Sequence, residues 1–252
     1  MGFRHLDGLA AALALSVIAA PSIAGEIGNP RGVVELFTSQ GCSSCPPADE
    51  LFAEMAGKGD IVALAYHVDY WDYLGWRDTL AKPENTARQR DYMRTFGSRS
   101  VYTPQAVING TTHVNGSDRA AIETALASGK ADAQGLPVPI TAKRLGDSLV
   151  IEVGEGKTGE KAHVVLVYYN PVTPIAIAEG ENRGRTVSYW NAVTDMQTAG
   201  VWHAKAARFE MPMSEVTKRG AGGCAVLLQS VGKDDTPGPI LGAAAIEYPS
   251  GL

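Results

Sequence analysis

The chain has 252 residues, of which 45% are hydrophobic and 19% charged, and its formal net charge is −5 at pH 7. This composition is typical of a globular protein with one large or two ordinary domains, and it excludes a chain that is disordered throughout. The acidic balance, with no Lys/Arg run longer than two residues, argues against a nucleic-acid-binding protein, because phosphate backbones require a basic surface.

The first 24 residues are typical of a secretory signal peptide. Arg4 precedes an apolar run over residues 9–20, and a small-x-small triplet follows at residues 22–24. The alternative is a membrane anchor, but a spanning helix needs about 20 apolar residues and this run is shorter. We therefore expect cleavage after Ala24, no stable membrane insertion of the mature chain, and a periplasmic or secreted location, where disulfides persist.

Two of the three cysteines, Cys42 and Cys45, lie between a predicted strand over residues 32–38 and a predicted helix that begins near Pro46. A disulfide across so short a loop adds little stability, so redox chemistry explains the pair better than stapling does. A helix start favours a thiolate. We expect Cys42 to be the exposed and more acidic thiol, and Cys45 to resolve a mixed disulfide.

The following residues complete a β-α-β unit and add further elements. Residues 61–66 predict a buried strand, and residues 67–78 predict a long loop rich in aromatic side chains and Asp. A helix is expected over residues 83–96. A hairpin is expected around Asn109-Gly110, and a last helix over residues 119–127.

The composition changes near residue 136, where a Pro-containing segment leads into short β-type runs. The runs predict an antiparallel sheet or sandwich and cover residues 148–153, 163–169, 186–189, 208–211, 224–229 and 240–246. We expect a signal peptide over residues 1–24, an α/β domain with the CxxC pair over residues 25–135, and an all-β domain over residues 136–252. Cys224 is expected to be a buried free thiol, and intermolecular pairing is the alternative.

The order of predicted elements over residues 32–130 resembles the thioredoxin fold. Most of the chain also resembles a narrower family of secreted bacterial thioredoxin-like proteins, known as domain of unknown function 1223. The stretches that carry this resemblance are VELFTSQGCSSCPPAD, YHVDYWDYLGW, TARQR, YTPQAVING and ENRGRT. The resemblance implies an α/β thioredoxin-like fold for residues 25–135, followed by the all-β domain.

The resemblance to thioredoxins also implies roles for single residues. Cys42 matches the nucleophile, Cys45 matches the resolving thiol, and Pro104 matches a proline that is cis and faces the disulfide. Thr103 would offer its backbone to a substrate strand. Glu35 lies near the position of a buried acid that receives a proton, although its spacing to the first cysteine is one residue longer. A glutamate at the edge or surface is the alternative.

Three aromatic residues of the long loop, Tyr70, Trp71 and Trp76, are further candidates. They are expected either to form a lid beside the CxxC pair that binds substrate, or to pack in the core. The polar loop at residues 181–185 is either solvated or in contact with the N-terminal domain or a substrate.

The residues His67, Asp69 and Asp72 alternate along the same loop, but three possible ligands within six residues are too weak a pattern to assign a metal. No cofactor is expected.

The sequence therefore predicts an exported thiol-disulfide oxidoreductase that exchanges disulfides with a protein or small thiol through Cys42 and Cys45. Two alternatives stay open. One is a Cu(I)-binding module that uses the same thiols, with thioethers from Met211 and Met213. The other is a non-catalytic binding scaffold with a structural disulfide.

Overall fold

The computed structural model describes residues 26–27, 30–131, 135–219, 221–232 and 235–247. The expected signal peptide, residues 1–24, lies outside these residues. No helix in the described part of the chain is both long and apolar enough to cross a membrane.

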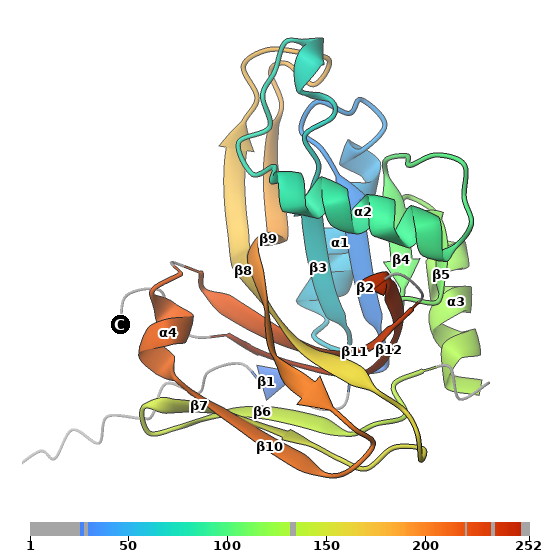
Figure 1. The fold of residues 1–252 in the computed structure, drawn as a ribbon. Coiled ribbons are helices and arrows are strands. Elements are labelled where there is room, and N and C mark those ends of the chain that lie inside the picture. Colours follow the sequence, from blue (N-terminus) through green and yellow to red (C-terminus); the bar gives the residue numbers. More distant parts are fainter. Residues whose placement is uncertain (1–25, 28–29, 132–134, 220, 233–234, 248–252) are drawn as a thin grey trace, which may run out of the picture.

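A nine-stranded mixed sheet forms the centre of the molecule, and a three-stranded antiparallel sheet packs beside it (Figure 1). The large sheet has the order β1 (Glu26–Ile27), β12 (Pro237–Glu247), β11 (Gly223–Val231), β8 (Ala162–Ala176), β9 (Thr186–Trp202), β3 (Val62–His67), β2 (Val33–Thr38), β4 (Gln105–Ile108) and β5 (Thr112–Asn115). The small sheet has the order β10 (Ala207–Pro212), β7 (Ser148–Val153) and β6 (Ile140–Leu145).

The predicted β-α-β unit is present, because β2, α1 (Pro46–Gly57) and β3 follow one another and the two strands pair in parallel. The remaining helices are α2 (Pro83–Thr95), α3 (Arg119–Ala131), the 3-10 helix η1 (Asp72–Leu74) and the short α4 (Met213–Thr217). Helix α2 crosses the front of the sheet in Figure 1, and α1 and α3 lie behind it. The predicted hairpin joins β4 to β5. Asn109 and Gly110 both have positive φ there, as a type I′ turn requires.

Side chains of β2 and β3 alternate between the two faces of the sheet. Val34 and Leu36 pack in the core formed with α1 and α3, whereas Val33 and Phe37 pack in the core that contains Tyr92 of α2. The same alternation places Thr38 and His67 on the α1 face and Glu35 on the α2 face. The two faces of β2 and β3 therefore carry different polar groups.

Of the strands after residue 136, β6, β7 and β10 form a separate antiparallel sheet, whereas β8, β9, β11 and β12 join the sheet that contains β2 and β3. This corrects the expectation that all the C-terminal strands form a sheet of their own. Strand β9 pairs in parallel with β3 at Ala192 and Ala65, and β8, β11 and β12 continue from β9 with antiparallel pairing. Strands β8 and β9 have 15 and 17 residues, so they extend beyond the predicted runs and reach the N-terminal part of the sheet. The large sheet therefore contains strands from both sides of residue 135.

Candidate active site

A disulfide joins Cys42 and Cys45 in the turn between β2 and α1. Cys45 occupies the N-cap position of α1, and its backbone N–H donates to the carbonyl of Cys42 at 3.2 Å. Ser43 and Ser44 are exposed, but Cys42 is only 2% exposed and Cys45 is fully buried. The expectation that Cys42 is exposed is therefore wrong for the disulfide form.

The Thr103–Pro104 peptide bond is cis, as the resemblance implied. The hydroxyl of Ser44 donates to the carbonyl oxygen of Thr103 at 3.5 Å and lies 3.4 Å from the Sγ atom of Cys42. Ser44 therefore connects the disulfide to the segment that contains the cis bond. These residues come from two parts of the chain that the fold brings together at the start of α1.

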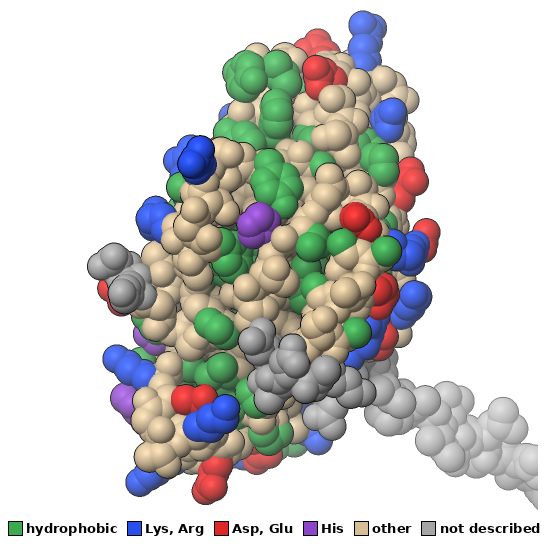
Figure 2. Space-filling view, turned by 90° about the vertical axis from the view of Figure 1, so that its right-hand side faces the viewer, with side chains coloured by type: hydrophobic (Ala, Val, Ile, Leu, Met, Phe, Trp, Pro, Cys, Tyr) green, Lys and Arg blue, Asp and Glu red, His purple; other side chains and the backbone are tan. Residues whose placement is uncertain are grey.

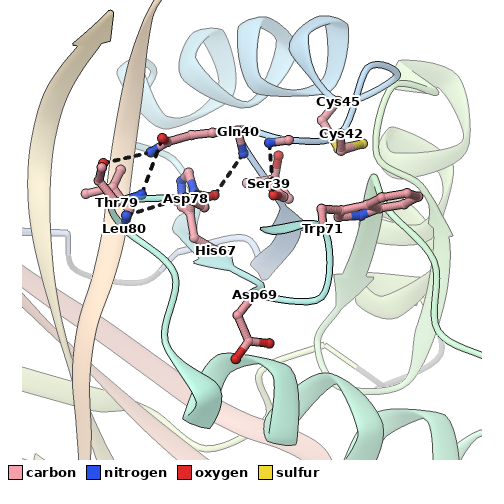
Figure 3. A network of polar contacts seen from close by, with 12 residues as sticks. Ser39, Gln40, Cys42, Cys45, His67, Asp69, Trp71, Asp78, Thr79 and Leu80 are labelled. Carbon is pink, nitrogen blue, oxygen red and sulfur yellow. Dashed lines mark hydrogen bonds and ion pairs between the residues drawn. A yellow bond between two sulfur atoms is a disulfide. The ribbon is translucent and has the colours of Figure 1, made fainter. Parts of the chain in front are cut away.

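Trp71, one of the three predicted lid residues, reaches this segment. Its indole Nε1–H donates to Thr103 Oγ1 at 2.8 Å, and Figure 3 shows the ring beside the cysteine pair. A Cβ atom at Gly41 would lie 3.1 Å from the Cβ of Trp71, so glycine allows the tryptophan to pack against the turn. Tyr73 stacks on Trp71 and is 77% exposed. Hydrophobic side chains gather at the top of Figure 2, the end where Figure 1 places η1.

Tyr70 and Trp76 make further contacts that hold the loop in place. Tyr70 donates its hydroxyl to Gln89 of α2 at 3.2 Å, and Trp76 donates its indole N–H to Gln40 Oε1 at 2.8 Å. Tyr70 thus packs the loop against α2. Trp76 instead holds Gln40, which lies two residues before Cys42.

A buried ion pair fixes the turn before Cys42 to the loop (Figure 3). The Asp78 carboxylate accepts from the backbone N–H of Gln40 and contacts His67 Nδ1, both at 2.8 Å. Burial alone would lower the pKa of His67, but the Asp78 charge and hydrogen bond leave it raised. Burial likewise opposes ionisation of Asp78, yet His67 holds the pKa of Asp78 below its ordinary value. The pair is therefore stabilised as imidazolium and carboxylate.

Asp49 is a second buried acid on this face, one helical turn after Cys45. Its carboxylate accepts from Thr38 Oγ1 at 2.7 Å, and the residue is 5% exposed. Burial raises the pKa of Asp49 to about 7, and His67 and the Thr38 hydrogen bond only partly oppose this rise. The predicted site did not include Asp49. The spacing of four residues from Cys45, which places both on one helix face, could have indicated it.

The loop between β8 and β9 reaches the CxxC turn through Asn182. Its side-chain amide donates to the carbonyl oxygens of Gln40 and Cys42, both at 2.9 Å, and the residue is 2% exposed. The sequence leaves open whether the loop at residues 181–185 is solvated or contacts the N-terminal domain or a substrate. At Asn182 the loop contacts the N-terminal part of the chain. The neighbouring Arg183 and Arg185 are exposed.

Glu35 is fully buried, so the expected alternative of an edge or surface glutamate is wrong. Arg88 Nε donates to its carboxylate at 2.7 Å, and the hydroxyl of Tyr92 donates to the other oxygen. Arg88 also donates to Gln229 of β11 at 2.9 Å. Because these partners lie on the α2 face, the structure does not bring Glu35 to Cys45, which begins α1 on the opposite face.

The remaining sequence candidates lie apart from the disulfide. Met213 is buried in the core of the small sheet and Met211 packs against that core. Strand β10 and helix α4, which carry them, lie in the lower half of Figure 1, far from the start of α1. The thioethers therefore cannot join Cys42 and Cys45 in a Cu(I) site. Cys224 is fully buried, and burial raises the pKa of its thiol to about 12.

The three alternating residues of the loop have separate partners. His67 pairs with Asp78, Asp69 accepts from Thr86 Oγ1 at 2.7 Å, and Asp72 accepts from the backbone N–H of Asp78 at 3.0 Å. Among the residues that the structure describes, no group of three or more His, Cys, Asp or Glu side chains is arranged to hold a metal.

The chain matches, over residues 33–229, the family described as "Protein of unknown function (DUF1223)". It is also similar to the crystal structure of an Agrobacterium tumefaciens protein determined as a structural-genomics target. The sequence identity is 45%, the TM-score is 0.81, and the match covers 88% of this chain and 96% of that chain. A comparison with curated proteins found no match.

Proposed function

This chain belongs to the DUF1223 family, and we propose that it is a thiol-disulfide oxidoreductase with a thioredoxin-like site. The observation that carries the proposal is the position of Ser44, whose hydroxyl lies within 3.5 Å of both Cys42 Sγ and the Thr103 carbonyl. A backbone segment thus lies beside a disulfide at a helix start. An extended substrate can pair with such a segment as an added strand.

The exchange runs through a mixed disulfide. The Cys42 thiolate attacks a substrate disulfide, one substrate sulfur leaves as a thiol, and the other stays bonded to Cys42. Cys45 then attacks Cys42 Sγ, which forms the Cys42–Cys45 bond and releases the second substrate thiol. The reverse steps oxidise a substrate dithiol. Because Cys42 is buried as a disulfide, Cys42 becomes accessible only when the covering side chains move.

The proposed substrate is a protein or small thiol, met in the periplasm or outside the cell. The signal-like residues 1–24 support export. Lys and Arg are interspersed with Asp and Glu on the face drawn in Figure 2, which supports a protein or thiol partner over a nucleic acid.

Trapping of the mixed disulfide tests the proposal. Reduced Cys45→Ser protein is incubated with oxidised glutathione and with a disulfide-bonded peptide, and the products are mapped by mass spectrometry. Cys42 should carry the substrate as a stable adduct. The matched variant Cys42→Ser, which keeps the more deeply buried thiol, should form much less adduct. The proposal fails if neither folded variant forms an adduct under conditions in which the unfolded chains do.

A further inference from the structure

A cluster of buried polar groups lies under the CxxC turn, on the α1 face of the sheet. It consists of Thr38, Asp49, His67 and Asp78, each at most 5% exposed. Two atoms of this cluster, Asp49 Oδ2 and His67 Nε2, are buried without a hydrogen-bond partner in the described structure. Buried polar atoms are nearly always paired, so these two atoms indicate a function beyond packing.

The backbone places Asp49 between Cys45 and His67. The backbone N–H of Asp49 donates to the carbonyl of Cys45 at 3.1 Å, and residues four apart lie on the same face of a helix. Thr38, which donates to Asp49, is in register with His67 on the adjacent parallel strand. Such neighbours are about 4.8 Å apart and their side chains share one face.

We propose, given the proposed function, that Asp49 accepts the proton that Cys45 must lose when it resolves a mixed disulfide. His67, held by its ion pair with Asp78, is a positioning residue that places a positive charge beside the Asp49 carboxylate. Glu35 does not compete for this role, because it is paired with Arg88 on the opposite face.

The proton and electrons balance in this step. The S–H bond of Cys45 breaks, and its proton moves to Asp49 Oδ2. The electron pair left on sulfur forms the bond to Cys42 Sγ, while the bond from Cys42 to the substrate sulfur breaks. The substrate leaves as a thiolate, which takes a proton from water.

A cavity beside α1 is the proposed route for the return of the proton. Asp49 lines a cavity of about 540 Å³ between α1 and the start of β9, together with Trp190 and the exposed Arg185. Water that enters this cavity can take the proton from Asp49 after the exchange. The cavity thus brings solvent close to a buried acid on the side of α1 that it lines.

The electrostatic surroundings suit a group that gains and loses a proton near neutral pH. Burial raises the pKa of Asp49 to about 7, which is where a general base works best. The titratable and charged groups around it are Glu50 on α1, His67 on β3, Asp78 after η1, Tyr189 on β9 and Arg185 just before β9.

The test separates attack by Cys42 from resolution by Cys45. Reduced protein is mixed with dithiobis(nitrobenzoate) in a stopped-flow instrument, and release of the coloured thiolate is followed from about pH 5 to 9. The first phase reports the attack of Cys42 and the second reports Cys45. In Asp49→Asn the second phase should slow at least about tenfold at pH 7, since a general base usually contributes about 100-fold or more. The first phase should change by less than about twofold, because the attack of Cys42 does not pass its proton to Asp49.

The wild-type rate of the second phase should rise with pH and show a midpoint near 7, since Asp49 must be ionised to accept a proton, and Asp49→Asn should lack that midpoint. The matched control Glu54→Gln, which alters an exposed acid further along α1, should behave as wild type. If the second phase has the same rate in wild type and Asp49→Asn, the proposed role of Asp49 is wrong, but the proposed function is not contradicted. If Asp49→Asn does not fold, the pH dependence of the wild-type second phase still tests the role of Asp49. A midpoint at the ordinary cysteine pKa of about 8.5 would contradict that role. A wild-type protein that releases no thiolate would instead contradict the proposed function.

Discussion

Asn182 offers a direct test of how the C-terminal strands support the site. Its amide is the link between the β8–β9 loop and the CxxC turn, through the carbonyls of Gln40 and Cys42. Asn182→Ala removes both hydrogen bonds and leaves two carbonyl oxygens of buried residues without this donor. We expect the variant to be less stable and its CxxC turn to be less firmly held.

The size of the effect follows from the two contacts. A neutral hydrogen bond contributes about 1 kcal/mol, and a buried acceptor left unpaired costs about 1 to 3 kcal/mol. For two bonds we expect a loss of about 3 kcal/mol in the free energy of unfolding. In a domain of this size that loss lowers Tm by about 6 to 12 °C.

Urea denaturation of the oxidised protein measures this loss, and limited alkylation of the reduced protein reports on access to Cys42. Arg183→Ala is the matched control, because Arg183 is adjacent and exposed, and it should change stability by less than about 0.5 kcal/mol. If Asn182→Ala is as stable as Arg183→Ala, the loop does not hold the CxxC turn and the inferred link is wrong.

Three further predictions concern other buried groups. Glu35→Gln should lower the free energy of unfolding, measured by urea denaturation, by about 3 to 5 kcal/mol, because it leaves Arg88 buried without its carboxylate. Slowed disulfide exchange in the folded variant would contradict our placement of Glu35 away from the cysteines. Cys224 should resist iodoacetamide at pH 8 in the folded protein and react only after unfolding, because burial raises the pKa of its thiol to about 12. Peptide mapping that finds Cys224 labelled in the folded protein would contradict this prediction. The folded-state pKa of Asp49 is raised from 3.8 to about 7, so the stability that its protonated form contributes is present below about pH 4 and lost as the pH rises to 7. Asp49→Asn should therefore gain stability relative to wild type across that interval, by on the order of 4 kcal/mol at about 1.4 kcal/mol per pH unit, and a constant difference from pH 4 to 8 would refute the raised pKa.

The N-terminal elements could be predicted from the sequence because each has a local signal. The apolar runs at β2 and β3, the prolines that begin α1 and α2, and the Asn109-Gly110 turn all act within a few residues. The partners of the C-terminal strands have no such signal. The pairing of β9 with β3 joins residues more than 100 positions apart, and periodicity does not specify it.

The part of the candidate site that has a local sequence signal could likewise be predicted. The cysteine pair and Pro104 were found from motifs and resemblance. Asp78 and Asn182 were not assigned, because their importance arises from contacts between distant segments. Asp49 was not assigned either, although its spacing of four residues from Cys45 is a local signal. The burial of Cys42 was missed for the same reason, since Trp71 and Asn182 reach the turn from elsewhere in the chain.

The reduction potential of the Cys42–Cys45 pair tests the central claim most directly. The protein is equilibrated across a glutathione redox series, the free thiols are alkylated, and the fraction of Cys42 and Cys45 in the disulfide is measured, with Cys224→Ala as the background. An exchange protein should show a reversible two-electron couple between about −120 and −270 mV. A potential below about −300 mV would identify a structural disulfide and contradict the proposed function.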